Sequence, residues 1–422
     1  MIDIKSTAKV QVKKFGGTSV GTIERIEALA DRLHRDISLG QKPIVVASAM
    51  SGETNRLIQL AESIDSDYRG PAYDMLVASG EQVSISLLSI ALKKRGLQAH
   101  PLLAYQLGIR TDSVHAKARI KEINGAKLLN LVENSVVPIV AGFQGVDDED
   151  NITTLGRGGS DTTAVALAAA IQADVCEIYT DVPAVFSADP RLVKKAREIS
   201  RLSFDEMMEM ASLGSKVLHI RCVEIAAKYG IRIHVRSSFE DRQGTWIVPE
   251  GEQMEQALVS AVTHDSNSAL IKLFPVPTGP RFLSQLFGVL ADRGVVVDVI
   301  TQSESTEGQR LAFTVPKEDI PLTRQVLKEL LPQIEPQSNL SSPTQTILIE
   351  NLAKISIVGV GMRNHPGVAA RFFQVLAKNN ITIHTVTTSE IKISAVINQD
   401  QLELAANTMH SEFDLDDSNI HP

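Results

Sequence analysis

Two glycine-rich turns carry the residue types that phosphoryl chemistry uses. The first, "KKFGGTSVGT" at residues 13–22, places Lys14 at the end of a β-type run and just before Gly16 and Gly17. Glycines let the backbone approach a phosphate closely, and a helix that follows offers free N–H groups. Lys14 is placed to neutralise charge on a transferring phosphoryl group. The turn is not a Walker A loop, because Thr22 stands where that motif needs a lysine. A strand-to-helix turn with solvated lysines is the alternative.

The second turn, "TLGRGGSDTT" at residues 154–163, leads into an alanine-rich helix. The planar guanidinium of Arg157 suits a carboxylate or a phosphate. Asp161 puts a negative charge at the mouth of this turn, which has two interpretations. Ser160 and Asp161 are both natural N-cap residues, so Asp161 could simply cap the helix. Alternatively, Asp161 and Lys216 belong to one charge network. Lys216 is expected in the first turn of a helix, where a positive charge is unfavourable unless an anion lies beside it.

Composition and charge exclude several classes of protein. The chain has 422 residues, enough for two or three domains, and its 43% hydrophobic and 22% charged residues are typical of a globular protein. A net charge of −8 and only 4% aromatic residues argue against nucleic-acid binding. No apolar run approaches the roughly 20 residues that cross a bilayer, and no signal peptide is visible. The two cysteines, Cys176 and Cys222, indicate buried thiols in a reducing compartment. We therefore expect a cytoplasmic protein that binds neither nucleic acid nor membrane.

The elements that must position these residues follow from an alternation over residues 1–250. Short β-type runs such as "PIVVASA", "VVPIVAGF" and "VCEIYTD" alternate with helical patterns such as "GTIERIEALADRLHRDI". Strands separated by helices predict an α/β domain whose mainly parallel sheet carries helices on both faces. Ligands of such sheets bind beyond the carboxyl ends of the strands, where Lys14, Ser48 and Thr180 fall.

The remaining chain contains a duplicated segment. Residues 287–304, "FGVLADRGVVVDVITQSE", align without a gap to residues 373–390, "FQVLAKNNITIHTVTTSE", with seven identical positions. The offset from 287 to 373, 86 residues, exceeds the period of solenoid repeats and indicates a duplicated small α+β domain. We expect domains at residues 1–250, 255–337 and 346–417, with terminal strands that can exchange between the repeats.

Two further patterns are rejected as sites. Gly359-x-Gly361 precedes an expected helix, but Asn364 occupies the third glycine position of a dinucleotide-binding fingerprint. The ten histidines show no metal-ligand spacing, so no metal site made by the protein alone is predicted.

Seven motifs, in their order along the chain, resemble those of aspartokinases, which have the amino-acid-kinase fold. They are "KKFGGTSV", "VASAMSGETN", "ASGEQVS", "AGFQGVD", the block from Thr154 to Arg191, "GSKVLH" and "VRSSF". The two repeats resemble the ACT regulatory domains of that family. The resemblance spans nearly the whole chain and implies a three-layer α/β/α kinase domain followed by two ferredoxin-like α+β ACT domains. It also implies transfer of the γ-phosphoryl of MgATP to the side-chain carboxylate of L-aspartate. The product, 4-phospho-L-aspartate, opens the synthesis of lysine, threonine and methionine.

The resemblance also implies a role for each motif residue. Lys14 would stabilise the transferring phosphoryl group, and Asp161 would orient Lys14. Arg157 would bind the α-carboxylate of aspartate, and Glu81, otherwise an unremarkable helical glutamate, would bind its ammonium group. The other residues implied in substrate binding are Ser48, Thr54 and Ser160. Those implied in binding the cofactor ATP, which acts with Mg²⁺, are Gly16, Gly17, Thr180, Asp181, Asp189, Arg191 and Lys216.

The first repeat departs from the family in its effector loop. Where the second repeat keeps "NHPGV", the first has Thr278-Gly279-Pro280-Arg281. Arg281 replaces the glycine whose backbone would meet an amino-acid effector, and Ser303 stands where the family often has asparagine. We therefore expect a weakened or altered pocket for lysine or threonine, in a homodimer or larger homo-oligomer. Some relatives make a separate regulatory subunit from an internal start, for which Met254 is the candidate.

Two other functions compete with this interpretation. Another amino-acid kinase, such as glutamate 5-kinase or acetylglutamate kinase, would share the fold, but an N-acetylated substrate offers no ammonium group to Glu81. A catalytically silent amino-acid sensor would use its ACT repeats alone, and it would not need Lys14, Arg157 and Asp161.

Overall fold

The computed structural model describes residues 10–215, 217–251, 258–305, 308–334 and 342–416. The chain forms two compact units, one of Met1–Phe186 with Glu198–Glu255 and the other of Ser187–Arg197 with Gln256–Pro422. Lys216 and Met254, which the sequence singled out, lie outside the described residues.

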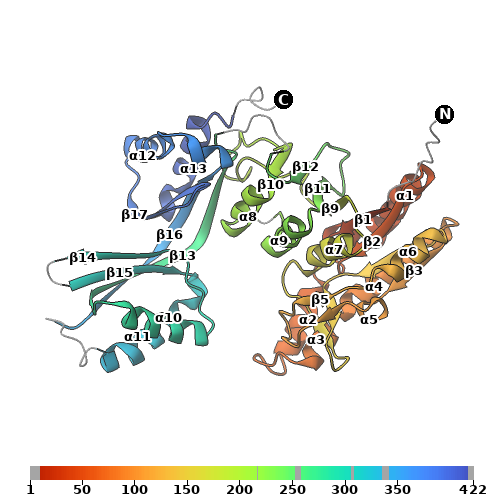
Figure 1. The fold of residues 1–422 in the computed structure, drawn as a ribbon, viewed down its shortest axis with the longest axis horizontal. Coiled ribbons are helices and arrows are strands. Elements are labelled where there is room, and N and C mark those ends of the chain that lie inside the picture. The colour runs from red at the N-terminus through yellow and green to blue at the C-terminus, as the bar shows by residue number, and fades with distance from the viewer. Residues whose placement is uncertain (1–9, 216, 252–257, 306–307, 335–341, 417–422) are drawn as a thin grey trace. The chain divides into compact units, whose positions relative to one another are not determined.

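The first unit is built on an eight-stranded sheet with the order β10-β12-β11-β9-β1-β2-β6-β3 (Figure 1). Every neighbouring pair in it is parallel except β11 and β12. This result confirms the mainly parallel sheet that the alternating sequence pattern predicted. The strands are β1 (Val10–Phe15), β2 (Lys42–Ala47), β3 (Ala99–Leu102), β6 (Val137–Ala141), β9 (Val175–Thr180), β10 (Arg201–Ser203), β11 (Arg232–Ser237) and β12 (Thr245–Val248).

Helices cover both faces of this sheet. On one face, Phe15 of β1 and Val45 of β2 pack with Leu33 of α1 and Leu88 of α4. On the other face, α7 lies beside β1, β9 and α9. Alanine-rich α7 is buried on all sides from its first turn, because small side chains allow its neighbours to approach closely. The helices of this unit are α1 (Ile23–Ser38), α2 (Glu53–Glu62), α3 (Pro71–Val77), α4 (Ser79–Lys94), α5 (Ala104–Leu107), α6 (Ala126–Glu133), α7 (Gly159–Ala170), α8 (Phe204–Ser212), α9 (Ile220–Tyr229) and the 3₁₀ helix η1 (Gly17–Val20).

A small sheet and one apolar helical stretch complete the first unit. The small sheet has the order β5-β4-β7-β8. Its strands are β4 (Arg110–Thr111), β5 (Ile120–Glu122), β7 (Gln144–Val146) and β8 (Ile152–Thr154). Among the described residues, the stretch Pro71–Lys94, formed by α3 and α4, is long and apolar enough to cross a membrane by length and composition. Its side chains Ile85, Leu88 and Leu92 pack in the core of the large sheet, as expected of a core helix.

The second unit contains the duplicated domains on one antiparallel sheet, with the order β14-β15-β13-β16-β18-β17. Each repeat runs helix, two strands, helix, which confirms the duplication. The first repeat comprises α10 (Pro280–Asp292), β14 (Ile300–Ser305), β15 (Gly308–Val315), η2 (Lys317–Asp319) and α11 (Ile320–Ile334). The second comprises η4 (Val360–Asn364), α12 (Val368–Lys378), β17 (Ile383–Thr388), β18 (Lys392–Asn398), η5 (Gln399–Gln401) and α13 (Leu402–Glu412). Two long strands serve both repeats, β13 (Ala261–Val276) and β16 (Gln345–Val358).

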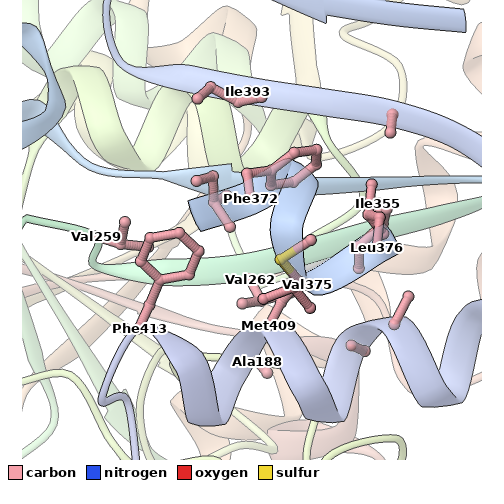
Figure 2. Packing of buried hydrophobic residues seen from close by; sticks show 14 of the residues in the cluster. Ala188, Val259, Val262, Ile355, Phe372, Val375, Leu376, Ile393, Met409 and Phe413 are labelled. Carbon is pink, nitrogen blue, oxygen red and sulfur yellow. The ribbon is translucent and has the colours of Figure 1, made fainter. Parts of the chain in front are cut away.

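Strand β13 changes partners along its length. Its residues 261–265 pair with the end of β16, and its residues 269–276 pair with β15 as well as with the beginning of β16. Val262 therefore belongs to the core of the second repeat, with Phe372 and Met409, as Figure 2 shows. The expected first small domain at residues 255–337 thus begins with residues that fold with its neighbour.

The segment Ser187–Arg197 also departs from the expected ranges, which assigned it to the domain at residues 1–250. It belongs to the second unit. The physical reason is apolar burial, because Ala188 and Val193 lie in the core of the second repeat. Turn residues such as Ala188-Asp189-Pro190 indicate only a loop in sequence and do not reveal which core a loop joins.

Candidate active site

A cavity of about 280 Å³ in the first unit brings together residues from both glycine-rich turns. Its lining includes all seven residues predicted for catalysis and substrate binding, namely Lys14, Ser48, Thr54, Glu81, Arg157, Ser160 and Asp161. Phe143 and the glycines 156, 158 and 159 complete the lining. Lys14, Ser48 and Phe143 lie at the carboxyl ends of β1, β2 and β6, where a parallel sheet places its ligands.

The centre of the cavity is an ion pair. The ammonium of Lys14, on β1, lies 2.6 Å from Oδ1 of Asp161, and about a tenth of each side chain is exposed. Asp161 is the third residue of α7, whose N-cap is Gly158 and has no side-chain cap. Asp161 is therefore not the N-cap residue of α7, and its contact with Lys14 is the one that the family resemblance implied. The expected network of Asp161 with Lys216 stays a prediction. The predicted partner Lys216 lies outside the described residues.

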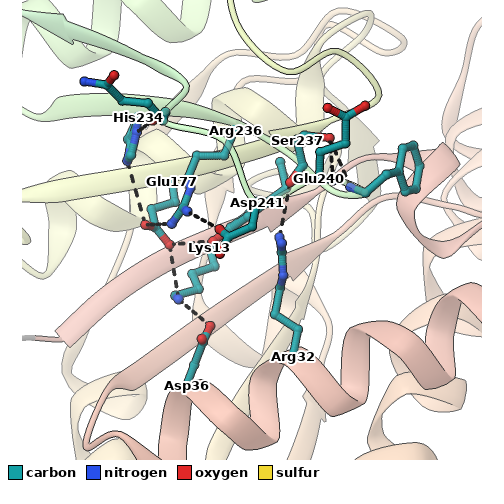
Figure 3. A network of polar contacts seen from close by, with 12 residues as sticks. Lys13, Arg32, Asp36, Glu177, His234, Arg236, Ser237, Glu240 and Asp241 are labelled. Carbon is teal, nitrogen blue, oxygen red and sulfur yellow. Dashed lines mark hydrogen bonds and ion pairs between the residues drawn. The ribbon is translucent and has the colours of Figure 1, made fainter. Parts of the chain in front are cut away.

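Lys13 occupies the opposite face of β1, because successive side chains of a strand alternate. Figure 3 shows its ammonium between Asp36 of α1, at 2.7 Å, and Glu177 of β9, at 3.2 Å. Burial raises the pKa of Glu177, but Lys13 and Arg236 outweigh this effect and hold that pKa below its usual value. Buried charges that are fully paired fix β1 in place, and with it the backbone of Lys14.

Two glycines in the turns have a steric requirement. Gly158 has φ of +70°, and a Cβ there would lie 2.3 Å from Cβ of His219. A Cβ on Gly17 would lie 3.0 Å from the carbonyl oxygen of Ala49. Both turns are therefore packed too closely against their neighbours to accept a side chain without movement.

Glu81 offers the cavity an unpaired carboxylate oxygen. It lies in the first turn of α4 and is only 2% exposed. Its Oε1 accepts a hydrogen bond from the backbone N–H of Ala49 at 3.1 Å, whereas Oε2 is buried without a hydrogen-bond partner among the described residues. Burial raises the pKa of Glu81 to about 8. A buried carboxylate with one free oxygen is suited to receive a cationic group of a ligand.

The turn that carries Arg157 is held by residues that sequence reasoning missed. The guanidinium of Arg221, on α9, donates to the carbonyl oxygens of Leu155 at 2.9 Å and Ala118 at 2.8 Å. Asp74 is fully buried, and its Oδ1 accepts a hydrogen bond from the hydroxyl group of Thr154 at 2.5 Å. Neither residue lies in a local pattern that signals chemistry. Arg157 itself is exposed at the cavity lining and available to a ligand.

The residues expected around the nucleotide are divided between the units. Gly16 and Gly17 follow β1, and Thr180 and Asp181 lie at the end of β9, which pairs with β1. The hydroxyl of Thr180 donates to Oδ1 of Asp181 at 3.1 Å. None of these four lines the cavity.

Asp189 and Arg191 instead belong to the second unit, where they pair with each other. The Nη2 of Arg191 lies 2.7 Å from Oδ2 of Asp189, and this contact lowers the pKa of the carboxyl group. Within the described residues, no group of three or more His, Cys, Asp or Glu side chains is placed to hold a metal ion.

Comparisons with known proteins decide the family. The profile of the Amino acid kinase family matches residues 9–237, and profiles of ACT domains match residues 276–332 and 355–413. An aspartate kinase of Stutzerimonas stutzeri is 47% identical over 407 residues, which cover 96% of this chain and 97% of that protein. Aspartokinase 2 of Bacillus subtilis is 44% identical over 405 residues, with the same coverage. The chain belongs to the aspartate kinase family.

Solved aspartate kinase structures agree with this assignment. Aspartokinase III of E. coli, in complex with aspartate and ADP in its R-state, superposes with a TM-score of 0.78 at 27% identity. The same enzyme with lysine and aspartate, in its T-state, superposes with a TM-score of 0.74 at 28% identity. Each comparison covers 96% of this chain and 99% of the other. The first unit is therefore the kinase domain of an aspartate kinase, and the second unit carries its two ACT domains.

The effector loops of the two ACT domains differ in structure. In the second, Gly367 is the N-cap of α12, with φ of +104°. In the first, Gly279 is the N-cap of α10, with φ of +96°, so α10 begins two residues earlier than its aligned counterpart. Arg281 is consequently an exposed residue of the first helical turn. The first ACT domain has moved its positive-φ glycine, which refines the expectation that Arg281 simply replaces it.

Proposed function

We propose that this aspartate kinase transfers the γ-phosphoryl group of ATP to the side-chain carboxylate of L-aspartate and thereby forms 4-phospho-L-aspartate. The observation that carries the proposal is the cavity in which the Lys14–Asp161 ion pair lies beside a cationic and an anionic side chain, Arg157 and Glu81. An α-amino acid presents one carboxylate and one ammonium group at fixed separation, and this pair of side chains matches both charges.

Positioning and charge account for the chemistry. Phosphoryl transfer needs little covalent assistance, because its transition state spreads negative charge over three equatorial oxygens. We assign the stabilisation of that charge to Lys14, together with N–H groups of the two glycine turns. Asp161 orients the ammonium of Lys14 through the 2.6 Å contact. Arg157 and Glu81 hold the α-carboxylate and α-ammonium groups, so that the side-chain carboxylate of aspartate faces Lys14, and Ser48, Thr54 and Ser160 complete the pocket.

The nucleotide is proposed to be bound with Mg²⁺. This ion binds through one or two carboxylates together with substrate phosphates rather than in an all-protein cage. The lining carboxylate left for this role is Asp161, because Glu81 is assigned to the ammonium group of aspartate. When bound, Mg²⁺ neutralises charge on the phosphate oxygens. Gly16, Gly17, Thr180, Asp181, Asp189, Arg191 and Lys216 are proposed to contact the nucleotide.

The ACT unit is proposed to regulate this reaction by binding an amino acid, with lysine or threonine as candidates. Support comes from the ACT domains themselves and from the relative that was crystallised with lysine. The earlier start of α10, at Pro280, places Arg281 in its first turn and argues for an altered pocket in the first ACT domain. A homo-oligomer in the cytoplasm is the proposed setting, with a product that leads toward lysine, threonine and methionine.

The experiment that tests the function compares acceptors and one variant. ATP consumption is measured with aspartate, glutamate and N-acetylglutamate side by side, and we expect turnover with aspartate alone. A preference for either other acceptor would identify a different amino-acid kinase, and no turnover with any of them would identify a silent sensor. Asp161→Asn keeps the shape of the side chain but removes its charge, and we expect a loss of about 100-fold or more in kcat. Full activity of this variant would refute the role of Asp161.

A further inference from the structure

The turn that carries Arg157 is braced from outside the cavity by the loop between β4 and β5. In this loop, the backbone N–H of Ala118 donates to the carbonyl oxygen of Thr154 at 2.9 Å. The carbonyl oxygen of Ala116 lies against Gly156, where a Cβ would approach it to 2.9 Å. The loop therefore contacts the backbone of the turn at two of the three positions that precede Arg157.

A single buried carboxylate joins this loop to the end of β8. Asp74, on α3, is fully buried. Its Oδ1 accepts hydrogen bonds from the hydroxyl group of Thr154 at 2.5 Å and from the backbone N–H of Ala116 at 3.0 Å. Its Oδ2 lies 2.7 Å from Nδ1 of His115. Because an ionised carboxylate can only accept, Nδ1 of His115 carries the proton and donates to Asp74. The carboxylate thus links α3, the loop and β8.

Ala116 lies in a strained conformation that these hydrogen bonds maintain. Its φ is +64°, in the left-handed region that is unfavourable for a residue with a Cβ. Its N–H donates to both oxygens of Asp74, at 3.0 and 3.2 Å, and hydrogen bonds to a charged group are the stronger ones in proteins. Loss of the carboxylate would therefore release Ala116, and with it the carbonyl oxygen that lies against Gly156. Strain that the surroundings maintain in this way is found most often at functional sites.

We propose that the contact of Asp74 with Thr154 positions Arg157 for the α-carboxylate of aspartate. His115 and Ala116 contribute by anchoring the loop to the same carboxylate. Arg157 is exposed and stands between glycines, so its own backbone restrains it little and the turn needs support from outside. Asp74 and Thr154 do not line the cavity, so they are positioning residues that act through Arg157. This inference rests on the proposed contact of Arg157 with the substrate.

The test is steady-state kinetics of Thr154→Val in the full chain. Valine keeps the shape of threonine but removes the hydroxyl group that donates to Asp74. We expect kcat/KM for aspartate to fall roughly tenfold, the effect of one lost hydrogen bond to a charged group, with the KM for ATP unchanged. Thr154→Ser keeps the hydroxyl group and should stay within about twofold of the unmodified enzyme. Asp74→Asn turns one acceptor into a donor and should lower kcat/KM at least as far as Thr154→Val.

The matched control is Thr153→Val, at the neighbouring position of β8. The side chain of Thr153 points to the other face of the strand, where its buried hydroxyl group lies 2.6 Å from that of Thr111. We expect both valine variants to lose thermal stability and only Thr154→Val to lower kcat/KM for aspartate. If Thr153→Val lowers it equally, or if Thr154→Val raises the KM for ATP as well, the fold is loosened in general and the inference is overturned.

A substrate analogue separates this inference from the proposed function. The α-amide of L-aspartate keeps the ammonium group and the side-chain carboxylate but lacks the α-carboxylate that Arg157 is proposed to bind. We expect the unmodified enzyme to prefer aspartate over this amide by about tenfold or more, Arg157→Ala to lose the preference, and Thr154→Val to reduce it. If Arg157→Ala keeps the preference, the proposed role of Arg157 is wrong and the positioning inference falls with it. If Arg157→Ala loses the preference and Thr154→Val keeps it in full, only the positioning inference is overturned.

Discussion

If Glu81 receives the α-ammonium group of aspartate, as proposed, its burial makes the binding of aspartate depend on pH. Glu81 must be ionised to receive the α-ammonium group of the substrate. Burial raises its pKa to about 8, so at neutral pH most free enzyme carries the protonated, non-binding form. We therefore predict that kcat/KM for aspartate rises as the pH increases from 6 to 8. The value of kcat/KM reports the ionisation of the free enzyme, which is the state in which this pKa applies.

The size of the effect follows from the pKa. Two pH units below it, about 1% of Glu81 is ionised, against half at pH 8, so kcat/KM is expected to be about 50-fold lower at pH 6. Glu81→Gln removes both the titration and the charge. Its kcat/KM for aspartate should be roughly 10- to 100-fold below the plateau of the unmodified enzyme, as for the loss of a charged hydrogen bond, and independent of pH in this range.

Initial rates at subsaturating aspartate and saturating ATP, taken between pH 6 and 9, provide the assay. The control is kcat/KM for ATP at saturating aspartate, in which this titration should be suppressed because the bound ammonium holds Glu81 ionised. The reasoning is refuted if the aspartate profile is flat in the unmodified enzyme, or if the same slope persists in Glu81→Gln.

The raised pKa of Glu81 also predicts that the stability of the fold depends on pH, in the direction opposite to that of aspartate binding. Between its ordinary value of 4.5 and about 8, Glu81 binds more protons in the folded than in the unfolded protein. The free energy of unfolding therefore falls as the pH rises through this window. Glu81→Gln lacks this contribution, so its stability relative to the unmodified protein should be higher at pH 8 than at pH 5. Thermal melts of both proteins at the two pH values measure the difference.

Three further substitutions test Gly158, the support that Arg221 gives to the turn of Arg157, and the effector loop of the first ACT domain. Gly158→Ala forces a Cβ into His219 at positive φ and should lower the unfolding free energy by roughly 1–3 kcal/mol, measured by denaturant titration; an unchanged midpoint would contradict the steric argument. Arg221→Ala frees the carbonyl oxygen of Leu155 and should raise the KM for aspartate by roughly tenfold without changing that for ATP, whereas equal changes in both would indicate general unfolding. Arg281→Gly should tighten lysine or threonine binding in calorimetry, and an unchanged affinity would show that Arg281 does not limit the pocket.

The sequence predicted the parts of the site that local chemistry specifies. Lys14 lies two residues before a glycine pair and Arg157 lies between glycines. The alternation of strands and helices predicted that Lys14 lies at the ligand-binding edge of the sheet. Glu81 emerged only through family resemblance, because its environment comes from Ala49, which is 32 positions away. Arg221 had no local signal, since an arginine in an amphipathic helix looks solvated until the fold brings two carbonyl oxygens to it.

Domain boundaries were harder to predict for a related physical reason. A long strand such as β13 satisfies its hydrogen bonds equally well with either repeat, so its residues do not reveal where one domain ends. The segment Ser187–Arg197 contributes only two deeply buried apolar side chains, which is too short a pattern to indicate its core. In both cases the partner, and not the local sequence, decides the assignment.

The placement of this segment bears on whether a separate regulatory polypeptide could start at Met254. Such a fragment would lack Ala188 and Val193, which fill part of the second ACT core, and it would leave Nε2 of His410 without its hydroxyl donor. Unfilled apolar volume and an unpaired buried polar atom both destabilise a fold. We therefore predict that residues 254–422, expressed alone, melt at a lower temperature than the same unit in the full chain. An added peptide of residues 185–199 should raise that melting temperature, and the same peptide carrying Ser187→Ala should raise it less. If neither peptide has an effect, the segment is not an integral part of the ACT fold.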